Sequence, residues 1–160
     1  MNRLKFITVV DEFDPSKVEE GNVDDSGRRQ GPWVHYSGED ITKTEYVDGE
    51  KHGTRFLYRN DVLIRSSHYQ DGRNIGPYED FYSDGTPQEA GEFIDGRFVV
   101  VWSAWSKGGE QTLINGNGYK DDEYGSDFFR SVYRKYFVKG LKVREEKLSD
   151  PLGPIQREPT

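Results

Sequence analysis

The side chains of this sequence that could do chemistry are 29 carboxylates and three histidines, because the chain contains no cysteine. His35, His52 and His68 share no spacing that would bring them together on one metal ion. The acidic segment 121–127 resembles a calcium-binding loop, but it lacks the glycine at the sixth position and the glutamate at the twelfth. The sequence has no nucleophile elbow and no phosphate-binding loop. We therefore expect a protein that is not an enzyme and that uses no metal and no cofactor.

Three aspartates recur too regularly to be a catalytic pair, and turn formation explains each of them. Asp48, Asp71 and Asp95 stand directly before a glycine, and Asp-Gly between strand-forming segments is a strong hairpin signal. They mark a repeat whose anchor glycines are spaced 22 to 24 residues apart. A second glycine follows four residues later in three copies, and an aromatic residue follows after nine. The structural residues of the repeat are Gly27, Gly31, Tyr36, Gly49, Gly53, Tyr58, Gly72, Gly76, Phe81 and Gly96.

The segments between these glycines favour short β-strands. Forward strands are expected at 33–36, 55–58 and 78–82, and return strands at 41–46, 63–69 and 89–94. Only 32% of the residues are apolar while 14% are aromatic, so large rings must supply most of the buried surface. Six residues after its anchor glycine the repeat carries Trp33, Tyr78 and Trp102, with Arg55 as the exception. We expect these rings to stack on one face of the sheet.

The repeat unit resembles the bacterial variant of the MORN repeat, and the chain resembles the YwqK family of antitoxins. Segments 46–53 and 69–76 carry the match, since each reads Tyr-x-Asp-Gly-x-x-x-Gly. The fourth copy departs from the pattern at Val100. The resemblance implies an elongated antiparallel sheet of successive hairpins. It also implies service as an antitoxin or immunity protein beside a toxin.

We predict an all-β fold, an elongated antiparallel sheet of tandem MORN-like hairpins with little or no helix. Residues 1–26 are expected to form an N-terminal strand, at 4–10, and an acidic arm that caps the repeats. Residues 27–148 form the repeat domain, which diverges after residue 97 and ends in a hairpin at 133–147. Residues 149–160 carry three prolines and are expected to be a loose tail.

Candidate partner-binding residues lie where the repeat breaks down. The uncharged stretch 99–102 is followed closely by Trp105. Tryptophan is enriched at binding hot spots, although a continuous apolar strand is more often buried core. The acidic segment 121–123, which we expect to be a loop, is the second candidate. The candidate partner-binding residues are therefore Trp102, Trp105, Asp121, Asp122, Glu123 and Tyr124.

The net charge of −7 argues against direct binding of nucleic acid and favours a basic protein partner. No apolar run approaches the roughly 18 residues of a membrane span, and no signal peptide is recognisable. We therefore place the protein in the cytoplasm and expect no membrane and no small-molecule substrate. The expected role is an antitoxin that occludes a toxin's active site, with acidic residues imitating phosphates where the toxin acts on nucleic acid. The alternatives are a non-enzymatic MORN-repeat scaffold or membrane-associated interaction protein, and a module that stacks carbohydrate on its rings.

Overall fold

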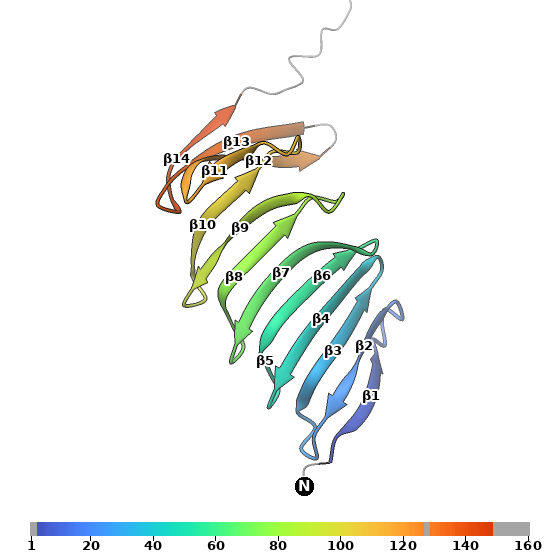
Figure 1. The fold of residues 1–160 in the computed structure, drawn as a ribbon. Coiled ribbons are helices and arrows are strands. Elements are labelled where there is room, and N and C mark those ends of the chain that lie inside the picture. The colour runs from blue at the N-terminus through green and yellow to red at the C-terminus, as the bar shows by residue number, and fades with distance from the viewer. Residues whose placement is uncertain (1–2, 127–128, 149–160) are drawn as a thin grey trace, which may run out of the picture.

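The computed structural model describes residues 3–126 and 129–148, which form one antiparallel sheet of 14 strands (Figure 1). Neighbours in the chain are neighbours in the sheet, except that the short β5 pairs only with β4, so that β4 and β6 lie side by side. The described residues form no helix, and hence none long and apolar enough to cross a membrane. The predicted all-β, elongated sheet of hairpins is confirmed. The strands are β1 (Lys5–Val10), β2 (Lys17–Val23), β3 (Arg29–Ser37), β4 (Asp40–Val47), β5 (Glu50–Lys51), β6 (Gly53–Arg59), β7 (Val62–Gln70), β8 (Arg73–Phe81), β9 (Pro87–Ile94), β10 (Phe98–Trp105), β11 (Gln111–Ile114), β12 (Asn117–Ser126), β13 (Phe129–Val138) and β14 (Leu141–Leu148).

Two-residue turns with a left-handed backbone connect many of these strands. In the three Asp-Gly turns of the repeat, both residues have positive φ, between 48° and 89°. The turns at 48–49 and 71–72 have two residues, and Arg97 adds a third residue to the turn at 95–96. Positive φ at both central residues is what a type I′ turn requires, and its twist matches that of the flanking strands. Glycine adopts this conformation at no steric cost. Positive φ at both residues recurs in the turns Asn60-Asp61, Asn115-Gly116 and Lys139-Gly140, and φ is also positive at Gly31, Gly53 and Gly76.

One face of the sheet, which we call the column face, carries a column of alternating large and small side chains. Running from β2 to β10, the column consists of Gly21, Trp33, Thr44, Arg55, Ser67, Tyr78, Gly91 and Val101. Trp33 and Tyr78 are each only 4% exposed. A methyl group added to Gly21 would lie 2.5 Å from the ring of Trp33, and one added to Gly91 would lie 2.7 Å from the ring of Tyr78. Each ring therefore packs over the backbone of the neighbouring strand at a glycine, where no side chain blocks it.

Trp102 does not join this column, so that part of the prediction is wrong. The pairing of β9 with β10 shifts between Val101 and Ser103, and Val101 takes the place opposite Gly91. Trp102 is 42% exposed. A β-bulge adds an unpaired residue to one strand and redirects the side chains around it, which explains why the column continues through Val101.

The main buried cluster lies at the C-terminal end of the sheet, where the chain curls over β10 (Figure 1). Leu113 has no exposed surface and is the centre of this cluster. Its other members come from β10 and β13 and are Val101, Ala104 and Phe137.

The turns of the β11–β12 and β13–β14 hairpins lie directly against β10. Val101 N–H donates to the carbonyl of Gly140 at 2.9 Å, and Gly116 N–H donates to the carbonyl of Trp102 at 2.8 Å. Val100 is buried and its side chain fills the space above Gly140. The fourth copy of the repeat therefore departs from glycine at Val100 because that position packs against the final turn.

The acidic segment predicted to be a loop is instead part of a strand, which corrects the sequence analysis. Asp121–Tyr124 belong to β12 and pair residue by residue with β13, with Asp121 opposite Arg134. Bases on the partner strand compensate the acidic charges, so the segment forms a ladder despite its composition. The strand β2 lies within the N-terminal arm and was not predicted. The predicted tail at 149–160 lies outside the described residues.

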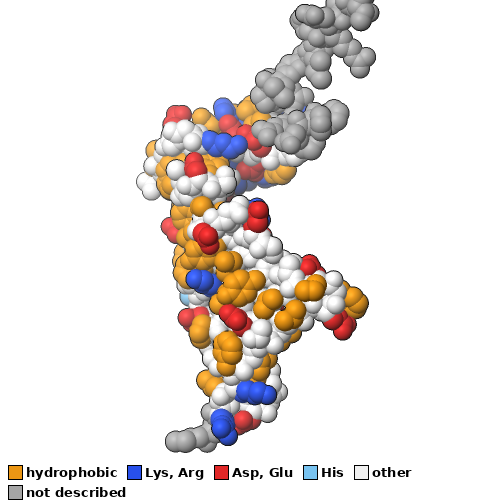
Figure 2. All heavy atoms as spheres, turned by 90° about the vertical axis from the view of Figure 1, so that its right-hand side faces the viewer, with side chains coloured by type: hydrophobic (Ala, Val, Ile, Leu, Met, Phe, Trp, Pro, Cys, Tyr) orange, Lys and Arg blue, Asp and Glu red, His pale blue; other side chains and the backbone are white. Residues whose placement is uncertain are grey.

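Because the sheet has no second layer along most of its length, many apolar side chains remain at the surface. Figure 2 shows apolar side chains gathered over the middle of the molecule, interrupted by acidic and basic ones. Phe6, Phe13 and Val143 are among the most exposed.

Candidate functional site

Five of the six candidate residues line one open depression of about 560 Å³ beside β12, which we call the β12 hollow. It forms because β11 has 4 residues and β12 has 10, so the outer half of β12 extends past the end of β11. The Tyr82 hydroxyl donates to the carbonyl of Trp105 at 2.7 Å and joins the end of β10 to the end of β8. The hollow presents the rings Tyr82, Trp105, Tyr119 and Tyr124 and the carboxylates Asp121, Asp122 and Glu123.

Each of the three carboxylates is paired with a base of the same chain. The pairs are Asp121 with Arg134 through two bonds of 2.8 Å, Asp122 with Lys135 at 2.5 Å and Lys120 at 3.4 Å, and Glu123 with Lys107 at 3.2 Å. The two-point contact of Arg134 with Asp121 is the strong, planar form of such a pair. The hollow is therefore not a free acidic surface, and imitation of phosphates there would require these pairs to open.

These pairs also set the ionisation of the hollow. Burial raises the pKa of Asp122, but the hydrogen bond from Lys135 and the charges of Lys120 and Lys135 outweigh it, so the pKa is lowered. Burial and the charge of Glu123 raise the pKa of the Tyr82 phenol. At neutral pH Asp122 is charged and Tyr82 is protonated. Neither group is poised to exchange a proton near neutral pH, as a general acid or base would be.

The structure does not bring Trp102 into the β12 hollow. Trp102 lines a separate depression of about 400 Å³ together with Ser66, His68 and Ala90, which alternate with the column residues along their strands and so lie on the opposite face. The candidate residues thus fall into two places on the sheet.

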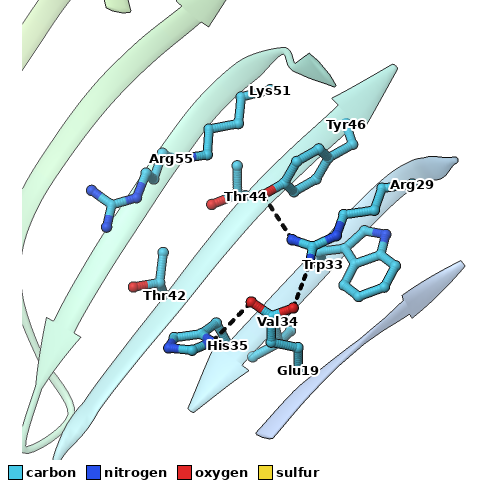
Figure 3. Close-up of a pocket in the computed structure, with 10 residues that line it drawn as sticks. All are labelled: Glu19, Arg29, Trp33, Val34, His35, Thr42, Thr44, Tyr46, Lys51 and Arg55. Carbon is cyan, nitrogen blue, oxygen red and sulfur yellow. Dashed lines mark hydrogen bonds and ion pairs between the residues drawn. The ribbon is translucent and has the colours of Figure 1, made fainter. Parts of the chain in front are cut away.

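A further depression, of about 180 Å³, lies on the column face between β2 and β6 and was not predicted (Figure 3). We call it the column hollow. It is lined by the cations Arg29, Lys51 and Arg55, with Glu19 as its carboxylate. Arg55 left a signal in the sequence, since it interrupts the ring column. Sequence reasoning gave this interruption no functional meaning.

Arg29 is held tightly inside the column hollow. Its guanidinium lies 4.4 Å from the centre of the Trp33 ring and 5.2 Å from that of Tyr46. It also donates to the Tyr46 hydroxyl at 3.1 Å and pairs with Glu19. Glu19 in turn lies 3.2 Å from Nδ1 of His35, as Figure 3 shows. The charge of Arg29 is therefore compensated within the chain.

Within 3–126 and 129–148, no group of three or more His, Asp or Glu side chains is arranged to hold a metal ion. What the three hollows offer is aromatic surface, paired charges and the cations Lys51 and Arg55. These are means of binding.

Comparisons with known proteins assign the chain to no family. No family model matches it, and no curated protein matches it. Two crystal structures of TarM show a weak likeness, one of a mutant from S. aureus in complex with Fondaparinux, alpha-GlcNAc-glycerol and UDP. Each has a TM-score of 0.42 at 11% or 12% identity, over 69% of this chain and 21% of the TarM chain. The chain thus spans about a fifth of TarM, and a likeness this low supports no conclusion on function.

Proposed function

We propose that this chain is a non-enzymatic binding protein that acts in the cytoplasm as an antitoxin or immunity protein. It would neutralise a cognate toxin by covering the toxin's active site. The observation that supports this most directly is the β12 hollow, where Trp105 lies among three tyrosines in an open depression of about 560 Å³. Tryptophan and tyrosine carry much of the binding energy at protein interfaces.

The β12 hollow is better suited to bind a partner through its aromatic rings than through free acidic groups. Its carboxylates are already paired within the chain. Rings that are partly buried lose little conformational freedom when a partner covers them, which favours binding. The paired charges around them form a polar rim, as in protein interfaces generally.

Co-expression with the product of the neighbouring gene tests this function. We expect rescue of growth and a stable complex on a sizing column. Trp105→Ala should weaken the complex by about tenfold or more, as the loss of a hot-spot tryptophan does. Phe13→Ala is the matched control, because Phe13 is the more exposed ring and lies at the other end of the sheet. Absence of both rescue and complex would refute the proposal.

A further inference from the structure

Arg55 stands on the column face where the neighbouring repeats carry a ring. The β6–β7 register places Ser67 beside it, and continuing the β4–β6 register places Thr44 on its other side. Trp33 and Tyr78 fill the equivalent positions and are buried, whereas Arg55 is only half-buried. Arg55 thus stands between two residues with small hydroxyl side chains, at a position that the fold otherwise fills with an aromatic ring.

Arg55 forms no ion pair with any described residue. The neighbouring Lys51 lies over the ring of Tyr69 at 5.4 Å and has no acidic partner among the described residues either. The carboxylates of this face are committed to other bases, namely Glu19 to Arg29, Asp80 to Arg65 and Glu89 to Lys120. Two half-buried cations without an acidic partner among the described residues therefore line one hollow, where they are available to an anionic group of a partner.

Ser67 supplies an independent observation. It is 2% exposed, and its Oγ forms no hydrogen bond with any described residue. Buried polar groups are nearly always hydrogen-bonded, and an unpaired hydroxyl destabilises the fold. A cation without an acceptor therefore lies beside a buried hydroxyl without a partner. One incoming oxyanion would satisfy both.

We propose that Arg55 and Ser67 bind a carboxylate, presented by an aspartate or glutamate side chain of a protein partner that lies across the column face. The proposal rests on the proposed function, because it requires the chain to bind a protein. The Arg55 guanidinium donates two parallel hydrogen bonds to the carboxylate oxygens. The Ser67 hydroxyl donates a third, and Lys51 adds a positive charge. A carboxylate suits the site better than a phosphate dianion, because Glu19 lines the same hollow and the chain carries a net charge of −7.

The first test is a titration of the full chain, observed through the Nε–H signals of its arginines by NMR. The probe is N-acetylglutamate methylamide, which carries one carboxylate. We expect a saturable shift of the Arg55 signal with a dissociation constant of about 10 mM. Arg97 is exposed, forms no ion pair with described residues and serves as the internal control. No saturation at Arg55 by about 100 mM, or tighter binding of inorganic phosphate than of the probe, would overturn the proposal.

Two variants extend the test. Arg55→Gln should abolish the titration and weaken a partner complex about 10- to 100-fold, while Arg97→Gln should change neither. Ser67→Ala should weaken probe binding several-fold and at the same time raise the midpoint of thermal unfolding, because it removes an unpaired buried hydroxyl. A Ser67→Ala variant that lowers the midpoint and leaves probe affinity unchanged would show that Ser67 is purely structural, and would refute the proposal.

The probe titration separates this inference from the proposed function, because it needs no partner. Saturable probe binding without any toxin complex would remove the antitoxin role and leave the carboxylate site. A toxin complex that forms equally well with Arg55→Gln, together with no probe binding, would remove the carboxylate site and leave the antitoxin role.

Discussion

One added methyl group, in Gly21→Ala, tests the packing that holds the N-terminal half of the sheet together. The backbone of Gly21 does not have the positive φ that would itself forbid a side chain. The three atoms nearest to the new methyl carbon all belong to the ring of Trp33 and would lie 2.5 to 2.6 Å from it. Carbon atoms in favourable contact are about 3.5–4.0 Å apart. The ring must therefore move by about 1 Å.

Trp33 cannot move freely, and this sets the magnitude. Its Nε1–H donates to the carbonyl of Asn22 at 3.0 Å, and Arg29 lies 4.4 Å from the ring centre. Overpacking of this kind costs about 1–3 kcal/mol, and loss of the indole hydrogen bond adds about 1 kcal/mol. We expect Gly21→Ala to lower the free energy of unfolding by about 2–4 kcal/mol.

Urea unfolding followed by far-ultraviolet circular dichroism measures this loss. Gly108→Ala is the matched control, because its methyl group would meet only Oγ of Ser106 at 3.7 Å. The control should stay within about 0.5 kcal/mol of the wild type. In a Trp33→Leu background the cost of Gly21→Ala should fall below about 1 kcal/mol. An equal cost in both backgrounds would show that the ring is not the cause, and would refute this account of the column.

Two further variants test the charges and the turns. Asp122→Asn should cost about 2 kcal/mol at pH 7, because it removes the negative charge that strengthens the 2.5 Å hydrogen bond from Lys135. Since the folded pKa of Asp122 is lowered from 3.8, its contribution is complete above that value and is lost as the pH falls through the folded pKa. Urea unfolding should therefore show that the free energies of unfolding of wild type and variant differ less at pH 3 than at pH 7. An equal difference at both pH values would contradict the lowered pKa of Asp122. Lys139→Asn should raise the free energy of unfolding by about 0.5–1 kcal/mol, because asparagine tolerates the observed φ of 50° better than lysine. Thermal unfolding checks this, and a loss of stability would mean that Lys139 makes contacts of its own.

The hairpins can be predicted from the sequence because the conformation of a turn depends on adjacent residues. Asp-Gly needs only its two residues to favour positive φ, so the turns at Asp48-Gly49, Asp71-Gly72 and Asp95-Gly96 form where the sequence indicated. Strand positions follow once the turns are fixed. The final hairpin, around Lys139-Gly140, was found in the same way.

The sequence predicts only some of the residues that form the column. Trp33 and Tyr78 were recognised as rings of one face, but Trp102 was assigned with them because spacing cannot reveal a bulge. The sequence pattern does not mark Gly21 and Thr44 as members of the column, because they share a small size and not a chemical type. The acidic composition of segment 121–123 predicts a loop. The segment is a strand because bases on β13, which lie elsewhere in the sequence, compensate its charge.

The sequence by itself determined the turns, the repeat and the direction in which the sheet grows. It also determined that Arg55 breaks the ring column. Only the tertiary structure decided that this arginine has no acidic partner among the described residues and that the hydroxyl of Ser67 is buried unpaired beside it. The physical reason is that a turn depends on adjacent residues, whereas a side chain's partners depend on the register between strands. That register brings together residues far apart in the chain, such as Arg65 with Asp80 and Asp121 with Arg134.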